Sequence, residues 1–341
     1  MKVLVTGGAG YIGAVLCETL LEKGYHVRCL DRLFFGKEPV AHLLENYPER
    51  FELVRGDVRW AGPEVLEDVG AVMDLAALSN DPTGELDPAK TMAINFAGRV
   101  RLAQMARERG VPRYILASSC SVYGFQDGVL DEDSPTSPLT TYARANLEAE
   151  KAILPLADGA FCPVALRQAT VYGLAPRMRF DLAINGMVLG FFKNGRIPIL
   201  RDGTQWRPFV HVRDTARAFV LALEAPAELV CGRIFNVGSE DQNVQIFALA
   251  QTVAESIGLP FAYEWYGLPD HRSYRVSFAR IARELGFAPR YTPADGAREI
   301  YRALKENRVT DGPRTITVQW YKHLLEMQRF IRETEINGVL L

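Results

Sequence analysis

The stretch that decides the fold is 2–13, which reads KVLVTGGAGYIG. A short run of strand-forming residues leads directly into a loop with glycines at positions 7, 10 and 13, and a helical pattern follows. In such a loop Gly7 permits the tight turn, Gly10 lets a pyrophosphate approach the backbone, and Gly13 lets the helix pack closely on the strand. The phosphates then face free N–H groups at the helix N-terminus. The stretch therefore predicts a dinucleotide-binding site.

A carboxylate at the end of the second predicted strand indicates which dinucleotide binds. Asp31 follows Gly13 by 18 residues, where its side chain accepts hydrogen bonds from the adenosine ribose hydroxyls and repels a 2′-phosphate. This favours NAD over NADP. The neighbouring Arg32 weakens the preference, because an arginine there is able to serve a 2′-phosphate.

Short apolar runs alternate with helical stretches through the first half of the chain. This alternation predicts a parallel sheet covered by helices on both faces, and right-handed crossovers make it a Rossmann-type doubly wound α/β fold. The expected strands are Lys2–Thr6, His26–Asp31, Phe51–Arg55, Ala71–Leu75, Tyr114–Ser118 and Cys162–Arg167, with helices over Gly13–Lys23 and Pro88–Arg109.

A change of texture after Gly173 predicts a second, smaller lobe. Pro, Gly and Arg become frequent there and the regular alternation fades. We expect residues 1–173 to form the dinucleotide-binding domain and residues 174–341 to form mainly a C-terminal substrate-binding lobe. The run Arg233–Gly238 reads as another strand, so a segment near 205–240 is expected to return to the first domain. The amphipathic tail Thr317–Thr334 is predicted to be helical.

The bulk composition argues against several classes of function. The chain has 341 residues, 48% of them hydrophobic, and a formal net charge of −2, which disfavours nucleic acid or an anionic membrane as the main partner. No apolar run approaches the length of a membrane span, and the N-terminal stretch reads as a buried strand rather than a signal peptide. The five cysteines are scattered without a CxxC pair, which favours a reduced, cytoplasmic setting. The scattered histidines predict no metal site.

The GxxGxxG spacing of the glycine loop resembles the extended short-chain dehydrogenase/reductase family, which includes nucleotide-sugar 4-epimerases, 4,6-dehydratases and related reductases. The resemblance continues along nearly the whole chain. Asp57-Val58 resembles the adenine-contacting pair, and Leu75-Ala76-Ala77 resembles the H-x-A-A strand end, with Asp74 where His is usual. The family implies NAD as the cofactor, held by Gly7, Gly10, Tyr11, Ile12, Gly13, Asp31, Arg32, Asp57, Val58, Leu75, Ala76, Ala77, Asn95, Ser118, Tyr142 and Asn146.

Further motifs resemble those with which the family binds a nucleoside-diphosphate sugar. The stretch 202–214, DGTQWRPFVHVRD, resembles G-D-G-x-Q-x-R-D-F-x-H-V-x-D, in which the arginine corresponding to Arg207 binds the diphosphate. A guanidinium suits that role because it binds phosphate oxygens in pairs. The stretch 270–275 resembles a later motif, which makes Arg272 the second phosphate ligand, with Arg275 as the alternative. The resemblance implies a substrate site of Ser119, Cys120, Thr170, Asn185, Arg207 and Arg272, in which Cys120 is expected mainly as a packed small residue.

The family's chemistry uses a tyrosine, a serine or threonine, and a lysine four residues after the tyrosine. Tyr142 corresponds to the acid/base and Ser119 to the hydroxyl partner, whereas the lysine position holds Asn146. An asparagine can hydrogen-bond a ribose hydroxyl, but it carries no charge to stabilise a tyrosinate. Arg144 and Lys151 point away from Tyr142 on a helix, so neither replaces the lysine locally. Three interpretations remain open: an enzyme with a less acidic tyrosine, a substitution introduced at this position, and a non-catalytic relative that still binds NAD.

The motif positions also favour one reaction over another. The 4,6-dehydratases carry Asp-Glu after the catalytic threonine, where this chain has Cys120-Ser121 and no carboxylate to eliminate water. A 4-epimerase reaction through a transient 4-keto sugar is therefore the leading hypothesis. A 4-ketoreductase or dehydrogenase would use the same residues and stays open, as does a Lys-lacking NAD-binding regulator or scaffold. The family also implies a homodimer.

Overall fold

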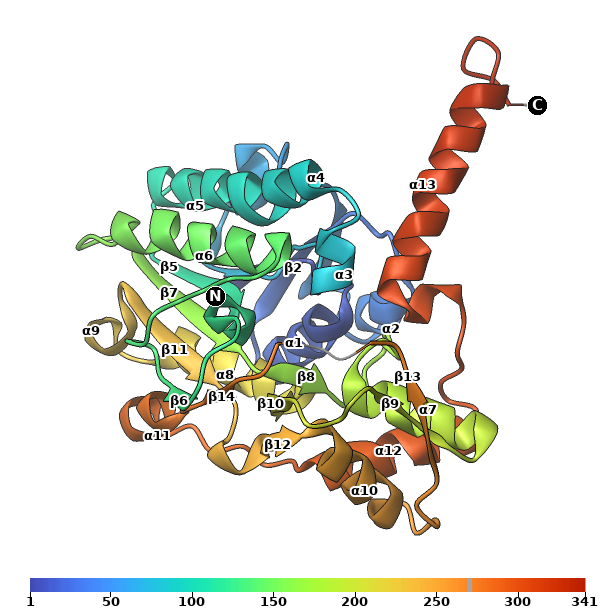
Figure 1. The fold of residues 1–341 in the computed structure, drawn as a ribbon. Coiled ribbons are helices and arrows are strands. Elements are labelled where there is room, and N and C mark those ends of the chain that lie inside the picture. Colours follow the sequence, from blue (N-terminus) through green and yellow to red (C-terminus); the bar gives the residue numbers. More distant parts are fainter. Residues whose placement is uncertain (269–271, 341) are drawn as a thin grey trace.

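A parallel sheet lies at the centre of the computed structural model, which describes residues 1–268 and 272–340 (Figure 1). Over these residues the sheet has seven strands in the order β11-β7-β5-β4-β1-β2-β3, and every neighbouring pair is parallel. This arrangement confirms the Rossmann-type doubly wound fold. The strands are β1 (Lys2–Thr6), β2 (His26–Asp31), β3 (Phe51–Arg55), β4 (Val69–Asp74), β5 (Arg113–Ser119), β7 (Cys162–Gln168) and β11 (Arg233–Val237).

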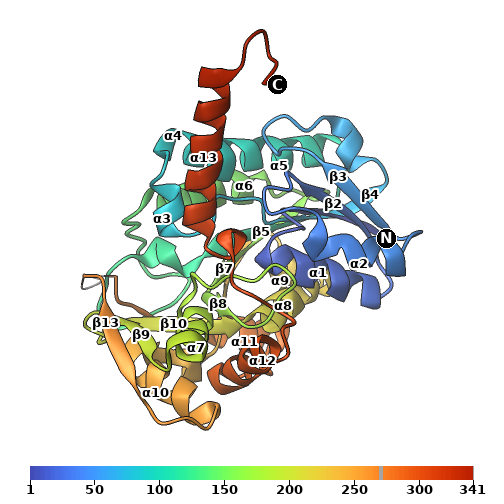
Figure 2. The ribbon, with the colours of Figure 1, turned by 90° about the vertical axis from the view of Figure 1, so that its right-hand side faces the viewer.

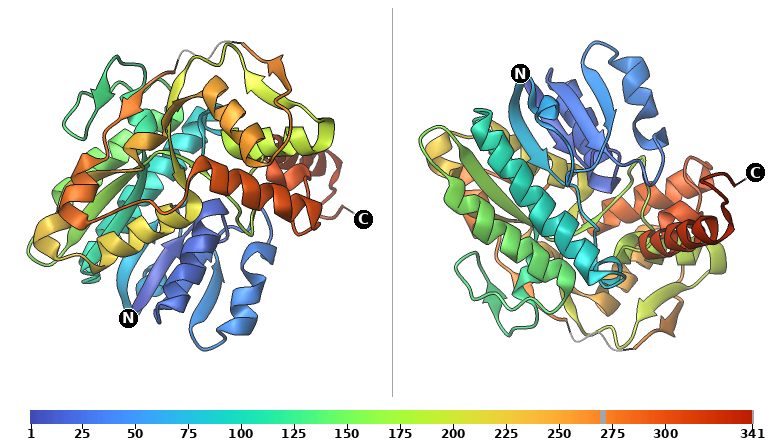
Figure 3. Two further views of the ribbon diagram at one scale, coloured as in Figure 1. Left: turned by 90° about the horizontal axis from the view of Figure 1, so that it is seen from below. Right: turned by 90° about the horizontal axis from the view of Figure 1, so that it is seen from above.

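Each sheet face is covered because successive side chains of a strand point in opposite directions. In β1, Val3 and Val5 pack into one core with α1 (Tyr11–Glu22), α2 (Glu38–Asn46) and α8 (Val212–Glu224). Leu4, between them, packs on the other face with α5 (Arg99–Glu108) and α6 (Thr141–Ile153). Figure 3 shows α5 and α6 side by side across that face. The sheet is thus buried on both sides, as its apolar strands require.

The predicted helix Pro88–Arg109 is not continuous. It consists of α4 (Pro88–Met92), a π-helical segment over Ala93–Gly98, and α5. Asn95 in the π-helical segment is buried, and its amide accepts a hydrogen bond from the Leu78 N–H and donates one to the Leu78 carbonyl. The prediction of one regular helix is therefore wrong in its middle, where the backbone widens and fixes the chain that follows β4.

The second lobe is built mainly from residues after 173. Its core is a separate apolar cluster formed by α7 (Ala183–Asn194), α10 (Ile246–Ser256) and α12 (Pro293–Lys305). Two small sheets join it: β8 (Thr170–Tyr172), β10 (Trp206–His211) and β12 (Asn243–Gln245), and β9 (Ile197–Leu200) with β13 (Tyr263–Tyr266). From β10 the chain returns through α8, which packs on α1, and β11, which pairs with β7. Shorter elements are α3 (Asp81–Gly84), β6 (Val129–Leu130), α9 (Ala227–Val230), β14 (Arg275–Val276) and α11 (Ala279–Leu285).

The C-terminal helix α13 (Thr317–Thr334) projects away from both lobes, as Figures 1 and 2 show. Its bounds are those predicted for the tail. Its first turns contact the protein body: the Trp320 indole donates to the Phe34 carbonyl at 2.6 Å, and the Tyr321 ring meets Phe34 and Phe35 edge-on. Over the residues described, no helix is both long and apolar enough to cross a bilayer.

Candidate active site

The glycine loop lies where the strand order of the sheet reverses, between β1 and β4. The carboxyl ends of the strands open a crevice at such a point. Gly7 has a φ of +67°, and a Cβ on it would meet the Ala76 backbone at 3.1 Å. A Cβ on Gly13 would lie 2.2 Å from the Gly7 carbonyl oxygen. The backbone therefore fits a dinucleotide loop, around which Ile12, Leu75, Ala76 and Ala77 are half-buried.

The Asp31 carboxylate ties the end of β2 to this loop. It accepts hydrogen bonds from the Ala9 N–H at 3.0 Å and the Leu33 N–H at 2.7 Å. Burial raises the pKa of Asp31, and these two backbone donors partly oppose the rise. The carboxylate is thereby held at the strand end, where it suits the ribose hydroxyls of a dinucleotide.

The neighbouring arginine is turned away from Asp31. Arg32 forms an ion pair with Asp57 at 2.8 Å, and its guanidinium lies over the Phe34 ring. Asp57 also accepts two hydrogen bonds from the Arg59 guanidinium. Although burial opposes it, hydrogen bonding to Arg59 and Arg32 lowers the pKa of Asp57. Val58, predicted beside the adenine, is buried in the core under α5. The pairing with Asp57 competes with any role of Arg32 toward a 2′-phosphate.

Two residues that were predicted to contact ligands, Asn185 and Tyr11, form hydrogen bonds within the protein. The Asn185 amide accepts from the Gly173 N–H and donates to the Tyr11 hydroxyl and the Arg179 carbonyl, and the residue has no exposed surface. The Tyr11 hydroxyl in turn donates to the Gly173 carbonyl at 2.7 Å. Both side chains thus join the loop helix α1 to the second lobe, and these hydrogen bonds use the polar atoms of the residues predicted to contact the cofactor (Tyr11) and the substrate (Asn185).

Three residues predicted near the reaction centre differ in what they present. Ser118 is buried and its hydroxyl donates to Glu150, which pairs with Arg167 beneath the sheet end. Cys120 is fully buried, its thiol lies 3.3 Å from the Arg167 carbonyl, and burial raises its pKa. Thr170 is half-buried in β8. The packed role expected for Cys120 agrees with this placement.

Tyr142 and Ser119 lie at facing element ends, in the first turn of α6 and the last residue of β5. The short helix α3 packs tightly on the tyrosine, because a Cβ on Gly84 would lie 2.9 Å from the Tyr142 Cβ. Burial raises the pKa of Tyr142 and the Asp81 carboxylate adds to the rise, whereas the Arg99 cation and hydrogen bonds from Asn146 and Ser119 lower it. The geometry thus brings together the predicted acid/base and its hydroxyl partner.

Asn146, at the usual lysine position, is buried and makes contact with a cation from another helix. Its Oδ1 accepts a hydrogen bond from the Arg99 guanidinium at 3.0 Å, and its Nδ2 donates to the Tyr142 carbonyl. The sequence predicted that Arg144 points away from Tyr142, and in the structure Arg144 is exposed and hydrogen-bonds the Thr141 hydroxyl. Arg99 was not identified from the sequence. Two features of the sequence could have identified it: a charged residue on an otherwise apolar helix face, and Asp74 at the end of an apolar strand.

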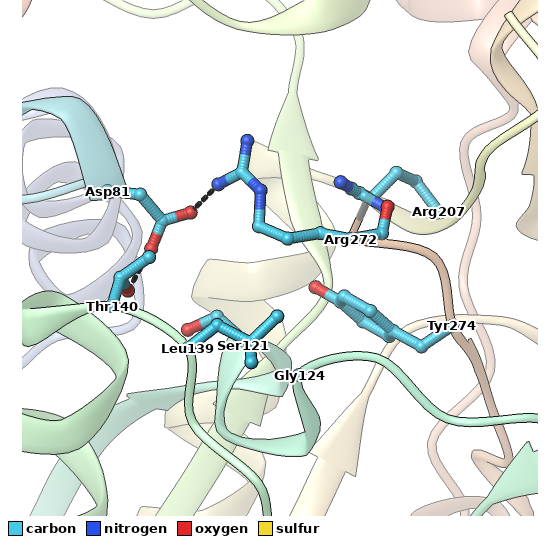
Figure 4. Close-up of a pocket in the computed structure, with 8 residues that line it drawn as sticks. All are labelled: Asp81, Ser121, Gly124, Leu139, Thr140, Arg207, Arg272 and Tyr274. Carbon is cyan, nitrogen blue, oxygen red and sulfur yellow. Dashed lines mark hydrogen bonds and ion pairs between the residues drawn. The ribbon is translucent and has the colours of Figure 1, made fainter. Parts of the chain in front are cut away.

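A pocket joins this region to the second lobe (Figure 4). Its guanidinium groups come from Arg207 in β10 and Arg272 beside β14, and Arg272 forms an ion pair with Asp81 of α3. The Arg207 guanidinium donates to the Arg272 carbonyl and lies over the Tyr274 ring. The other predicted phosphate ligand, Arg275, lies over Trp206. Of the stretch 270–275, positions 270 and 271 fall outside the described residues. The pocket is lined by Asp81, Ser121, Gly124, Leu139, Thr140, Arg207, Arg272 and Tyr274.

Comparison with known proteins shows the family of the chain. Residues 3–238 match the model of the NAD dependent epimerase/dehydratase family, to which the chain belongs. A UDP-glucose 4-epimerase of Corynebacterium glutamicum is 30% identical over 310 residues, covering 86% of this chain and 92% of its own. Two solved structures superpose with TM-scores of 0.79: the UDP-glucuronic acid 4-epimerase of Bacillus cereus with UDP-glucuronic acid and NAD (25% identity, 90% and 100% coverage), and a dTDP-glucose 4,6-dehydratase of Streptomyces venezuelae with NAD (28%, 90% and 98%).

Proposed function

We propose that the protein is an NAD-dependent nucleotide-sugar 4-epimerase. The family and the cofactor are those of nucleotide-sugar epimerases and dehydratases. The observation that carries the finer proposal is the meeting of Tyr142 and Ser119 beside a pocket with two guanidinium groups. Arg207 and Arg272 suit a diphosphate. The sugar then extends toward Tyr142, with Cys120-Ser121 offering no carboxylate for elimination of water.

In this mechanism Tyr142 takes the proton of the sugar 4-hydroxyl and later returns it. Ser119 hydrogen-bonds the same hydroxyl and holds it against the tyrosine. NAD, when bound in the crevice of Gly7 and Gly13, supplies a hydride acceptor and donor. Arg207 and Arg272 hold the diphosphate while the 4-keto sugar presents its other face, so the stereochemistry at C4 is inverted.

The test is incubation of the purified protein with UDP-glucose, UDP-galactose, UDP-glucuronic acid and dTDP-glucose, with products identified by NMR and mass spectrometry. A 4-epimerase interconverts one C4 pair in both directions without change of mass and without net NADH. Tyr142→Phe should reduce turnover by about 10²-fold or more while NAD remains bound.

Other products would replace the proposal. Loss of one water identifies a 4,6-dehydratase, and stoichiometric change in NADH identifies a reductase or dehydrogenase. Binding of NAD and UDP without conversion of any sugar would leave the Lys-lacking regulator or scaffold as the function.

A further inference from the structure

A buried arginine stands beside the position from which the usual lysine is missing. Arg99 is 1% exposed, and its guanidinium binds groups from three elements. Nε contacts the Asp74 carboxylate at 3.0 Å, Nη2 donates to the Asp74 and Ala117 carbonyls, and Nη1 donates to the Asn146 Oδ1 at 3.0 Å. A buried charge is tolerated when it is paired and hydrogen-bonded, and each of the three guanidinium nitrogens of Arg99 has a partner.

The two residues that contact Arg99 from either side both depart from the family pattern. Asp74 stands where a histidine is usual and Asn146 where a lysine is usual. Asp74 is further held by the Thr6 and Tyr114 hydroxyls, both at 2.7 Å. The carboxylate therefore fixes one edge of the guanidinium, and the opposite edge, Nη1, is directed at Asn146.

The Asn146 amide connects this cation to the tyrosine. Its oxygen accepts from Arg99, and its nitrogen donates to the main-chain carbonyl of Tyr142. A hydrogen bond from Asn146 to the phenol also lowers the pKa of Tyr142, against the rise caused by burial. A hydrogen bond from a cation to an amide oxygen polarises the amide and strengthens its N–H donors. A lysine in place of Asn146 would remove this acceptor and bring a second cation against Arg99.

We propose that Arg99, acting through the Asn146 amide, supplies the positive charge that the lysine of the tyrosine motif supplies in the family. Arg99 is thus a positioning residue for Tyr142, and Asp74 holds it in place. The inference rests on the proposed function, in which Tyr142 is the acid/base. On this proposal the absence of the lysine reflects a cation placed on another helix, and not a loss of activity.

The other polar and charged groups around this network come from β5, α3, α6 and the loop before α7. Tyr114 and Ser119 lie on β5, Asp81 on α3, and Arg179 in the second lobe. Glu150, one turn beyond Asn146 on α6, is ion-paired with Arg167 at 2.7 Å, and neither it nor Asp74 is among the main groups that shift the pKa of Tyr142. Of these groups Asp81 opposes a tyrosinate at Tyr142, and Arg99 favours it.

The test is a direct titration of the Tyr142 phenol in the NAD-loaded protein, by ultraviolet difference against Tyr142→Phe. The double variant D74N/R99Q removes both charges together, so no unpaired charge is left buried. We expect the phenol midpoint and the acid limb of the kcat/KM profile to rise by about one pH unit. Asn146→Lys in that background should restore both. In the unsubstituted protein the same substitution should lower the thermal midpoint without lowering the phenol midpoint.

Tyr114→Phe is the matched control, because it removes one hydrogen bond from Asp74 and leaves both charges in place. It should leave the phenol titration unchanged. Asn146→Ala offers a second variant that keeps the Arg99–Asp74 pair intact, and it should raise the phenol midpoint even if D74N/R99Q does not fold.

Two results would overturn the inference: an unchanged phenol midpoint in D74N/R99Q, or an equal fall caused by Asn146→Lys in both backgrounds. The titration needs no substrate, so it separates this inference from the proposed function. A phenol that responds as expected in a protein that converts no nucleotide-sugar contradicts the epimerase alone.

Discussion

At Gly13 of the dinucleotide loop only a glycine fits, because neighbouring backbone atoms occupy the space that a side chain would need. A Cβ on Gly13 would approach the Gly7 carbonyl oxygen to 2.2 Å and the Gly8 Cα to 2.7 Å. Neither atom belongs to a flexible side chain, so the loop must shift. Gly159, by contrast, has open space where a Cβ would lie and therefore offers a matched control.

We expect Gly13→Ala to weaken NAD binding by about tenfold or more and to lower the free energy of unfolding by about 1–3 kcal/mol. The measurements are NAD titration by calorimetry and thermal denaturation. Gly159→Ala should change neither. Full NAD affinity in Gly13→Ala would show that the loop relaxes without cost.

The Asp81 carboxylate controls the tyrosine from α3. It raises the pKa of Tyr142 in addition to the rise caused by burial, because a nearby anion disfavours a tyrosinate. Asp81→Asn should therefore lower the pKa of Tyr142 and move the acid limb of kcat/KM to lower pH, so the fraction of active enzyme rises at neutral pH. A pH–rate profile checks the direction, with the exposed Asp127→Asn as control. A shift to higher pH would contradict this account.

Among the elements, helix α13 packs on the protein at its start and is exposed farther along. Its first turns hold the loop that follows Asp31, through Trp320 and Tyr321, whereas Phe330 farther along is 61% exposed. The buried Arg177 also donates to the Thr317 hydroxyl at the helix start and lies over the Phe35 ring. The helix start therefore packs beside the end of β2, where Asp31 is predicted to bind the ribose.

Trp320→Ala should lower the free energy of unfolding by about 1–2 kcal/mol, since a hydrogen bond and ring packing are lost together. We also expect NAD to bind less tightly, because the loop after Asp31 loses its support. Chemical denaturation and NAD titration measure the two effects. Phe330→Ala on the same helix is the control, and an equal loss in both variants would mean that α13 contributes only its own folding.

At the scale of the whole molecule, the pocket draws on both lobes. Asp81 lies in α3, Ser121 just after β5 and Thr140 at the start of α6, while Arg207 lies in β10 and Tyr274 directly before β14. A ligand that fills the pocket contacts both parts at once, so its binding should stabilise the whole fold.

We expect UDP at about 100 times its Kd to add about 2.7 kcal/mol to the stability of the NAD-loaded protein. Arg207→Met should abolish the stabilisation by UDP and keep that by NAD, as measured by thermal denaturation with each ligand. Arg308→Met on the surface serves as control. Loss of the NAD response as well would show that Arg207 is needed for the fold rather than for the diphosphate.

The homodimer stays a prediction that light scattering can test.

The sequence by itself determined the fold, and it located most of the residues of the candidate site. The period of the apolar runs defined the parallel strands, since a strand buried on both faces has to be apolar throughout, and the glycine spacing located the loop. The local motifs also located Tyr142, Ser119 and Asp31, because each follows a recognisable strand or begins a helix. The π-helical interruption at Ala93–Gly98 was missed, since its wide turn has no periodic signal.

Only the tertiary structure decided what surrounds Tyr142. Asp74, Arg99 and Asn146 are far apart in the chain and meet because β4, α5 and α6 pack together. Helix geometry could exclude Arg144 and Lys151, which are local, but it could not place a cation from another helix. The structure likewise turned Asn185 inward. Contacts between segments that are distant in the chain depend on how helices and strands pack, and the spacing of residues within one motif does not determine that packing.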